Sequence, residues 1–361
     1  RVAQLGERRP YKANVGSSSL STPTRTDLSF PTLSSYSVSL CLSGYPVSDV
    51  FESWLNPPEV PLSVIDSELY RRAGIQVGIL RLDLIHPEIS GNKWFKLKHN
   101  LASLPAGSRV ISFGGAYSNH IHALAFAGRQ QGLKTVGVIR GEESSAENPS
   151  LSDARKWGME LVFVSREQFR NRHDKVWLAD LARKYDGGVI VPEGGSNANA
   201  VKGAAEIVEL LPPDTDVVVL PVGTGGTLAG VVSAFGGSVI GVPVLKGADF
   251  LYEDVKTLLS GSGLNEQADW MLDLDGHFGG YGRLKPEVAS FKMLFEQRYG
   301  VELDCVYTAK MVLAFNYRVV RGLVPEGSRI VLLHTGGIQG NRGMIETLYD
   351  QGIKYRGVLP V

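Results

Sequence analysis

The chain has little cysteine, no excess of either charge and no long hydrophobic run. Only Cys41 and Cys305 occur among its 361 residues. Two cysteines cannot make a disulfide framework, so we expect a reducing compartment, the cytoplasm by default. The 37 basic and 37 acidic residues balance, which gives no general attraction to nucleic acid or to an anionic membrane surface. No apolar run approaches the roughly 20 residues that span a bilayer. We therefore expect neither a nucleic-acid partner nor a membrane.

The length of 361 residues suggests about two domains, at roughly 150 residues each. Residues 1–46 differ from the rest: they are rich in serine, threonine and basic residues, and contain only Glu7 and Asp27 as acids. This composition is typical of an organellar targeting peptide. The alternative, which we favour, is a disordered extension or one produced by a misplaced start codon. In either case we expect this segment outside the catalytic fold.

From about Pro61 onwards, runs of β-branched residues alternate with segments of helical length. We expect strands over residues 77–84, 109–113, 135–139, 160–164, 188–191 and 216–222, and helices over 93–104, 123–127, 150–157 and 166–185. Short, continuous apolar strands indicate mostly parallel sheets with helices on both faces, an α/β fold. Right-handed crossovers bring the loops after such strands to one edge, where α/β proteins bind ligands.

Lys93 lies at a predicted loop-to-helix junction, directly after Asn92, which we expect to cap the helix. An isolated lysine in such a place is usually a solvated side chain. Lys96 lies one turn further on the same face, so both amines can reach one anion. Trp94 and Phe95 flank the two lysines and would exclude water, which lowers the pKa of an amine and favours its reaction with a carbonyl group. Lys93 is therefore a candidate nucleophile.

The loop after the strand over residues 109–113 is a candidate anion site. It continues through Gly114-Gly115 to Ser118 and Asn119 at the start of a helix, where free N–H groups suit a carboxylate. The alternative is an ordinary helix cap. His120 and His122 have a spacing that some metal sites use. Residues two apart on a helix face different ways, so we expect no metal.

A second loop follows the run over residues 216–222 and consists of Gly223, Thr224, Gly225, Gly226 and Thr227. It presents successive N–H groups at a helix N-terminus, where a phosphate can bind. It lacks the last glycine of a dinucleotide fingerprint and the Gly-Lys-Ser/Thr ending of a P-loop. A tight structural turn is the alternative. A reactive lysine together with a phosphate cradle indicates a pyridoxal-phosphate enzyme.

Seven motifs, in order from about Leu55 to the carboxyl end, resemble the family of D-cysteine desulfhydrases and 1-aminocyclopropane-1-carboxylate (ACC) deaminases. They are Gly91-Asn92-Lys93, Gly114-Gly115 with Ser118-Asn119-His120, Glu193-Gly194-Gly195-Ser196-Asn197, residues 223–227, Tyr281-Gly282, Val306-Tyr307-Thr308 and His334-Thr335-Gly336-Gly337. The resemblance implies the α/β fold type II of pyridoxal 5'-phosphate enzymes. It implies a large domain of residues 47–94 plus 186–361, a small domain of residues 95–185 and the cofactor in the cleft between them. A homodimer and a small amino-acid substrate are also implied.

The resemblance further implies a role for each matching residue. Lys93 would be the Schiff-base lysine, and Lys96 with the 223–227 loop would hold the phosphate. Asn119 would bond the ring hydroxyl oxygen, and Ser118 would lie beside the substrate carboxylate as a candidate acid or base. The two active-site tyrosines would be Tyr281 and Tyr307, and Thr335 would face the pyridine nitrogen.

Two positions distinguish the two activities of the family, and this chain has threonine at both. ACC deaminases resemble one another in a Glu directly after the second tyrosine and a Leu directly after the late histidine, where this chain has Thr308 and Thr335. A neutral hydroxyl at the pyridine nitrogen makes a weaker electron sink, which suits β-elimination. We therefore expect a D-cysteine desulfhydrase-type lyase that forms pyruvate, ammonia and hydrogen sulfide. The nearest alternative is ACC deaminase activity, which gives 2-oxobutanoate and ammonia.

Two departures from the family pattern leave the substrate open. Tyr117 replaces the usual Gln before the Ser-Asn pair and would put a phenol near the substrate, and Cys305 replaces the usual Pro before Tyr307. A metal-dependent hydrolase using His120 and His122, and a non-catalytic small-molecule binding protein, are the more distant alternatives.

Overall fold

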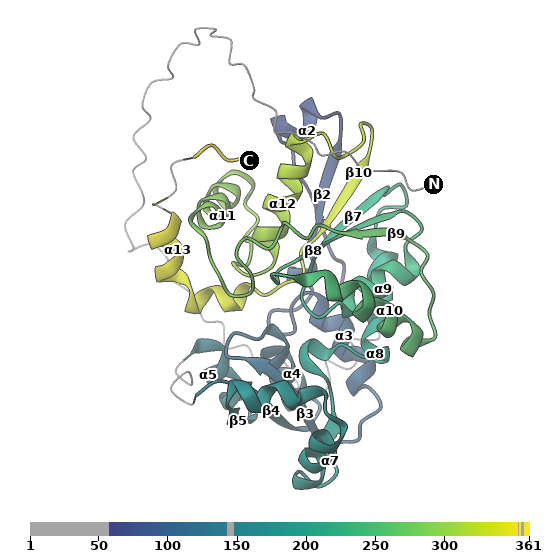
Figure 1. Cartoon of the computed structure of the whole chain (residues 1–361), viewed down its shortest axis with the longest axis vertical. Helices are drawn as coiled ribbons and strands as arrows, with labels where there is room; N and C mark the ends of the chain where they lie inside the picture. Colours follow the sequence, from purple (N-terminus) through teal and green to yellow (C-terminus); the bar gives the residue numbers. More distant parts are fainter. Residues whose placement is uncertain (1–57, 143–147, 353, 355–356) are drawn as a thin grey trace, which may run out of the picture. The chain divides into compact units, whose positions relative to one another are not determined.

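The computed structural model describes residues 58–142, 148–352, 354 and 357–361 (Figure 1). The extension predicted over residues 1–46 lies outside these ranges. No helix of the described part is long and apolar enough to cross a membrane.

The larger sheet has six strands in the order β1-β2-β10-β7-β8-β9. The strands are β1 (Leu62–Val64), β2 (Gln76–Leu80), β7 (Val217–Val222), β8 (Ser238–Pro243), β9 (Asp269–Leu272) and β10 (Arg329–Leu333). Only the β1–β2 pair is antiparallel among these described strands. The last strand in sequence, β10, thus lies in the middle of the sheet, between β2 and β7.

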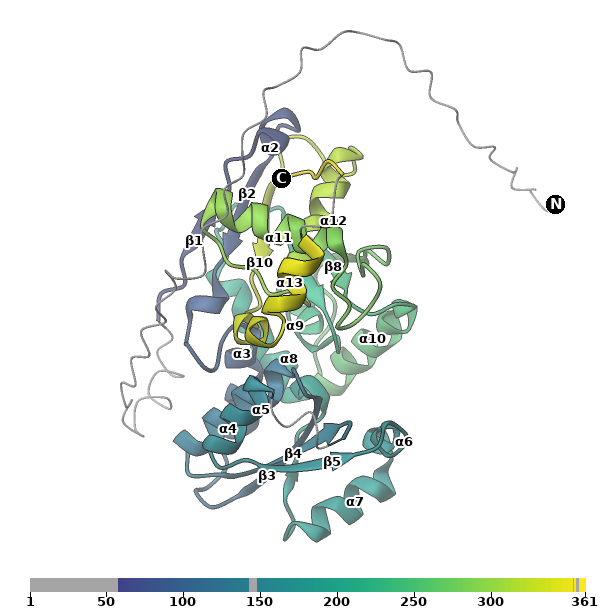
Figure 2. The same cartoon turned by 90° about the vertical axis from the view of Figure 1, so that its left-hand side faces the viewer.

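The smaller sheet has four parallel strands in the order β5-β4-β3-β6. They are β3 (Arg109–Gly115), β4 (Lys134–Arg140), β5 (Glu160–Val164) and β6 (Val189–Ile190). Figure 2 shows α4 and α5 on one side of this sheet and α7 on the other.

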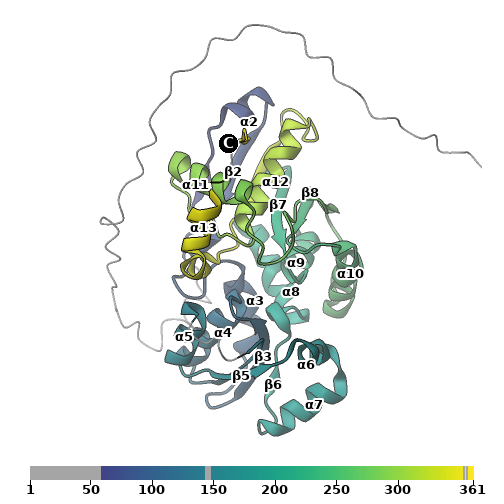
Figure 3. The same cartoon turned by 60° about the vertical axis from the view of Figure 1, so that its left-hand side comes forward.

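Helices cover both faces of each sheet. Their bounds are α2 (Glu68–Arg72), α3 (Asn92–Leu101), α4 (Asn119–Gln130), α5 (Pro149–Lys156), α6 (Arg166–Arg170), α7 (Lys175–Lys184), α8 (Ala198–Ala205), α9 (Gly226–Ala234), α10 (Leu251–Ser262), α11 (Pro286–Tyr299), α12 (Thr308–Val320) and α13 (Ile345–Gly352). Alternate residues of β7 enter different cores: Val218 and Leu220 pack on the α9 side, whereas Val217 and Val219 pack with α11 and α12. Figure 3 shows the backbone of β7 and of these helices. The predicted α/β fold with mostly parallel sheets is confirmed.

Three local predictions were wrong. The strand expected over residues 77–84 ends at Leu80, because Leu82–Leu84 form a 3-10 turn (η1) beside an Arg81–Asp83 ion pair of 2.7 Å. The helix expected over residues 166–185 is broken into α6, a 3-10 turn (η3, Asn171–His173) and α7, because Asp174 caps α7 by accepting the N–H of Trp177. Asn92 does not cap α3; it is the first helical residue, after Gly91.

The predicted domain boundaries remain a prediction. All four strands of the smaller sheet fall between residues 109 and 190, which is close to the small domain expected over residues 95–185. One hydrophobic core nevertheless includes side chains from both sheets, for example Val110 and Ile139 from the smaller and Val218 and Leu220 from the larger.

Candidate active site

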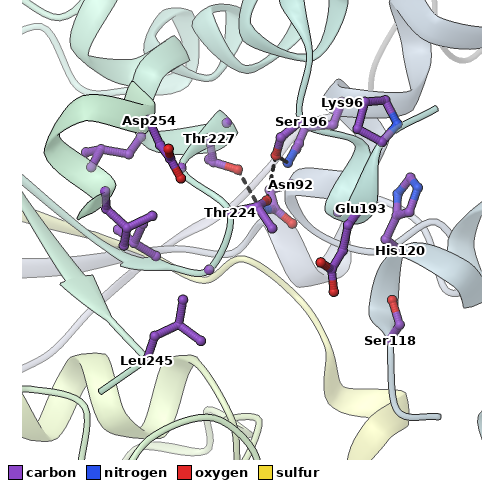
Figure 4. A pocket seen from close by; sticks show the side chains of 18 of the residues that line it. Asn92, Lys96, Ser118, His120, Glu193, Ser196, Thr224, Thr227, Leu245 and Asp254 are labelled. Atoms are coloured by element: carbon purple, nitrogen blue, oxygen red, sulfur yellow. Dashed lines mark hydrogen bonds between the residues drawn. The ribbon is translucent and has the colours of Figure 1, made fainter. Parts of the chain in front are cut away.

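A cavity of about 730 Å³ lies where the carboxyl ends of strands from both sheets meet the starts of α3, α4 and α9. Every residue that the sequence singled out as a candidate for catalysis or cofactor binding lines it. They are Lys93, Lys96, Ser118, Asn119, Gly223, Thr224, Gly225, Gly226, Thr227, Tyr281, Tyr307 and Thr335. Figure 4 shows part of the lining, with Thr224 and Ser196 facing each other and Ser118 and His120 further along the wall.

Lys93 is held beside the glycine loop by an asparagine. Its Nζ donates to Asn92 Oδ1 at 2.7 Å, and Asn92 Nδ2 donates to Thr227 Oγ1 at 2.7 Å. The helix can begin here because Gly91 has φ +68°, and a Cβ at that position would lie 2.0 Å from the carbonyl oxygen of Thr335. The chain segments at positions 91 and 335 therefore lie closer together than any residue other than glycine at position 91 would permit.

Burial lowers the pKa of Lys93 to about 8, and the negative charge of Asp304 partly opposes this shift. A substantial fraction of this amine is therefore neutral near physiological pH. A neutral amine can attack a carbonyl, which an ammonium cannot. The environment of Lys93 thus matches what covalent attachment of a carbonyl cofactor requires.

The glycine loop leads from β7 to the N-terminus of α9, with Gly225 in the left-handed region at φ +77°. Lys96 Nζ donates to Ser196 Oγ at 2.8 Å, and Ser196 also hydrogen-bonds Thr224. A Cβ on Gly226 would lie 2.7 Å from Ser196 Oγ and 3.0 Å from Lys96 Nζ. An ammonium group, two hydroxyls and a helix N-terminus thus converge on one point, an arrangement suited to a phosphate.

Lys96 is buried, and desolvation together with the neighbouring charge of Lys93 lowers its pKa well below the ordinary value. A bound phosphate dianion would counter both effects. The loop and Lys96 therefore fit the phosphate of the predicted cofactor, although the role of each residue remains a prediction.

Ser118 and Asn119 stand between β3 and α4. Ser118 caps the helix by accepting the N–H of Ile121 at 3.3 Å, as the alternative interpretation expected, and it also lines the cavity. Ser118 can occupy this position only because residue 114 is glycine, since a Cβ on Gly114 would lie 2.6 Å from Ser118 Oγ. Asn119 Oδ1 accepts a hydrogen bond from Gln339 at 3.0 Å.

Tyr281 and Tyr307 face each other at the cavity, with ring centroids 6.1 Å apart and planes at 72°. Burial raises the pKa of both phenols, and that of Tyr307 well above the ordinary value. Both hydroxyls therefore carry their protons at neutral pH. Tyr307 also approaches the glycine loop, since a Cβ on Gly223 would lie 3.2 Å from its ring.

Other residues at the cavity received no role from the sequence. Arg172 pairs with Glu193 at 2.6 Å, and both line the cavity together with Arg140, His173 and Ser196. Arg140 ends β4 directly beside Gly115 of β3. The rule that ligands bind at the carboxyl ends of parallel strands could have indicated Arg140. No comparable signal pointed to Arg172, because it lies in the turn that breaks a predicted helix.

His120, His122 and Tyr117 have different contacts and do not form one site. His120 Nε2 lies 2.8 Å from Ser112 Oγ, whereas the His122 ring lies edge-on to Trp157. Tyr117 packs against Gly343 and is not among the residues that line the cavity. The expectation that its phenol lies near the substrate stays a prediction.

Residues 64–336 match the protein-family model described as pyridoxal-phosphate dependent enzyme. The chain belongs to this family. The match covers both sheets apart from the first two residues of β1, and it covers every residue that lines the cavity. This protein is therefore a pyridoxal 5'-phosphate-dependent enzyme, as the sequence predicted.

Individual members of the family agree with this assignment. A putative 1-aminocyclopropane-1-carboxylate deaminase of Pyrococcus abyssi is 30% identical, over 79% of this chain and 91% of that protein. A mitochondrial bifunctional D-cysteine desulfhydrase/1-aminocyclopropane-1-carboxylate deaminase of Arabidopsis thaliana is 28% identical, over 77% of this chain and 74% of that protein. The crystal structure of an ACC deaminase homologue superimposes with a TM-score of 0.71 at 23% identity, covering 84% of this chain and 99% of that one.

Proposed function

We propose that the enzyme is a D-cysteine desulfhydrase-type lyase. In this reaction the α-C–H and Cβ–S bonds break, a Cα–Cβ double bond forms and the sulfur leaves with the electron pair. Water then converts the released enamine into pyruvate and ammonia, so that D-cysteine and water give pyruvate, ammonia and hydrogen sulfide.

One observation carries this proposal: neither of the two positions that distinguish the activities brings a carboxylate to the cavity, where an acid would make a stronger electron sink, and Thr335, which lines it, is neutral. Thr308, the other residue that distinguishes the activities, is fully buried, and its hydroxyl donates to Asp304 at 2.7 Å. Position 308 therefore adds no carboxylate to the cavity. A weak electron sink favours a reaction in which the leaving group takes the electrons.

The residues of the cavity can divide the work. Bound pyridoxal phosphate supplies the electron-withdrawing ring that acidifies the α-proton. Lys93, with its pKa near 8, can accept that proton at Nζ. Ser118 and the N-terminus of α4 can bind the substrate carboxylate. Tyr281 and Tyr307, whose hydroxyls stay protonated, can donate to the departing sulfur.

ACC deaminase activity is the second candidate, and the names of both relatives support it. The two reactions have different products. The purified, cofactor-loaded enzyme should release sulfide and pyruvate from D-cysteine and little 2-oxobutanoate from ACC. The Lys93→Ala variant should release no product from either substrate. Faster release of 2-oxobutanoate from ACC than of sulfide from D-cysteine would reject the proposal.

The same assay separates the more distant alternatives. A pyridoxal-phosphate lyase should be inhibited by hydroxylamine, which captures the cofactor carbonyl, and should retain activity after chelation of metals.

We further propose that the enzyme is a cytoplasmic homodimer with the two domains described above, as the family resemblance implies. Light scattering during gel filtration would measure its mass.

A further inference from the structure

Tyr281 lies on a loop whose backbone has little intrinsic preference for one conformation. The loop connects β9 to α11 and contains four residues with positive φ: Phe278 at 45°, Gly279 at 94°, Gly280 at 99° and Gly282 at 67°. Glycine admits many conformations of such a segment. Holding the phenol of Tyr281 in the cavity therefore requires an anchor from outside the loop.

Lys310 of α12 supplies such an anchor. Its Nζ donates to the carbonyl oxygen of Gly280, directly before Tyr281, at 2.7 Å. The same carbonyl also accepts the N–H of Arg283 at 3.2 Å, but that bond lies within the loop. Lys310 is fully buried and does not line the cavity. It can therefore affect the reaction only through the residues that it holds.

Stability alone does not account for a lysine at this position. Removing an ammonium group from water costs several kcal/mol, and one neutral carbonyl recovers little of that. Burial lowers the pKa of Lys310 to about 8, with Asp304 partly opposing the shift. An apolar side chain of similar volume would serve the fold as well.

Asp304 holds the second tyrosine at the start of the same helix. Its Oδ1 accepts the N–H groups of Val306 at 2.9 Å and Tyr307 at 2.8 Å. Its Oδ2 accepts the N–H and the hydroxyl of Thr308, both at 2.7 Å. The start of α12 and the residues just before it therefore anchor both tyrosines, Tyr307 through Asp304 and Tyr281 through Lys310.

We propose that Lys310 is a positioning residue, whose bond to Gly280 sets the place of the Tyr281 hydroxyl relative to Tyr307 and the substrate. The kinetic part of this inference rests on the proposed lyase function. The structural part, that Lys310 orders the loop, does not. The two parts can therefore fail separately.

The structural part is tested by hydrogen–deuterium exchange of the cofactor-loaded enzyme. Lys310→Met, which keeps most of the length of the side chain but removes the donor, should speed exchange in peptides that cover residues 277–284 by tenfold or more. Exchange elsewhere should stay near that of the parent. Lys292→Met is the matched control, since Lys292 is also buried but pairs with Glu296 within α11, away from the cavity. It should leave the loop unchanged.

The kinetic part is tested by a double-mutant cycle. Lys310→Met should lower kcat for sulfide release by about tenfold with little change in KM, because a misplaced group affects the chemical step. In a Tyr281→Phe background it should have almost no further effect. If Lys310→Met does not fold, Lys310→Leu, which also lacks the donor, replaces it in both experiments.

Unchanged exchange over residues 277–284 would overturn the proposal. So would an equal loss of kcat in the parent and Tyr281→Phe backgrounds, because it would mean that Lys310 does not act through Tyr281. A parent enzyme that releases no sulfide would instead reject the proposed function, and the exchange result would still decide whether Lys310 orders the loop.

Discussion

Lys93 combines two properties that a solvated lysine lacks: a pKa lowered to about 8 by burial, and a fixed direction given by Asn92. The neutral amine is the reactive form, and its fraction rises with pH until the pKa is passed. We expect the rate at which the cofactor-free protein binds pyridoxal phosphate covalently to increase up to about pH 8 and then level off. Growth of the visible absorption band measures this rate.

Nα-Acetyl-lysine provides the reference for this measurement. Its single amine has an ordinary pKa near 10.4, so its reaction with the same aldehyde should continue to accelerate beyond pH 9. Lys93→Ala should develop no protein-bound band. A protein rate that followed the curve of Nα-acetyl-lysine would contradict the lowered pKa.

The residues that could be predicted from the sequence are those whose type alone suggests a chemical role. Lys93, Lys96 and the glycines after β7 were found because an amine and a side-chain-free loop have few other uses at a strand end. Asp304 and Arg172 were missed. Their importance arises from what they contact, namely the N–H groups before α12 and the Glu193 carboxylate. Arg172 and Glu193 are 21 positions apart, and no local pattern joins them. Asp304 contacts N–H groups only a few positions further on, so a search for capping side chains could have indicated it.

Helices α3 and α8 pack so closely that a glycine is required between them. A Cβ at Gly203 would lie 2.0 Å from the carbonyl oxygen of Phe95, whereas one at Gly261 of α10 would meet nothing within 4 Å. Gly203→Ala should lower the free energy of unfolding by about 1–3 kcal/mol. Gly261→Ala should raise it by about 0.4–1 kcal/mol, because alanine favours a helix. Urea unfolding of both variants tests this pair.

The N-terminus of α9 gives a second prediction. Gly226→Ala would push a methyl group between Lys96 and Ser196 and displace a charge-assisted hydrogen bond worth about 1.5–3 kcal/mol. The dissociation constant for pyridoxal phosphate should rise by about 10- to 100-fold. Gly236→Ala, in open space, should leave it unchanged. Equal affinities of the two variants would argue against a phosphate at this helix.

At the level of elements, the type of most segments was predictable and their interruptions were not. The segment over residues 166–185 keeps helical spacing throughout, yet α6 ends at Arg170 and, after the 3-10 turn, Asp174 caps a separate helix, α7. A side chain that competes for backbone N–H groups can override periodicity.

The buried charge of Lys310 predicts how the stability of the whole protein depends on pH. The pKa of Lys310 is about 8 in the folded protein and near 10.4 in an unfolded chain. Below pH 8 both states hold the proton, and the cost of burying the charge is present in full. Between pH 8 and 10.4 the unfolded state binds more protons, so this cost is gradually removed as pH rises.

Lys310→Met lacks this buried charge at every pH. Relative to the parent, the cofactor-free variant should therefore be most stable below pH 8 and lose that relative stability as pH rises towards 10.4. Denaturant unfolding of both proteins at pH 7, 8, 9 and 10 gives the difference directly. A difference independent of pH would contradict the lowered pKa of Lys310.

The fold class followed from sequence because buried parallel strands have a recognisable composition, but the order of the strands did not. The place of β10 between β2 and β7 depends on pairing with two strands that are distant in the sequence, at Arg329↔Gln76 and Ile330↔Val217. A single sequence carries no direct record of such a pairing.

The central position of β10 has a consequence for biosynthesis. Thr335 can reach Gly91 and complete the pocket only after β10 and the segment that follows it have been translated. A nascent polypeptide that ends before residue 329 has the reactive lysine and the phosphate loop, but not the strand that joins their supports. Vitamin B6 incorporation should therefore follow translation of β10, and truncations that remove β10 should accumulate as colourless, protease-sensitive fragments.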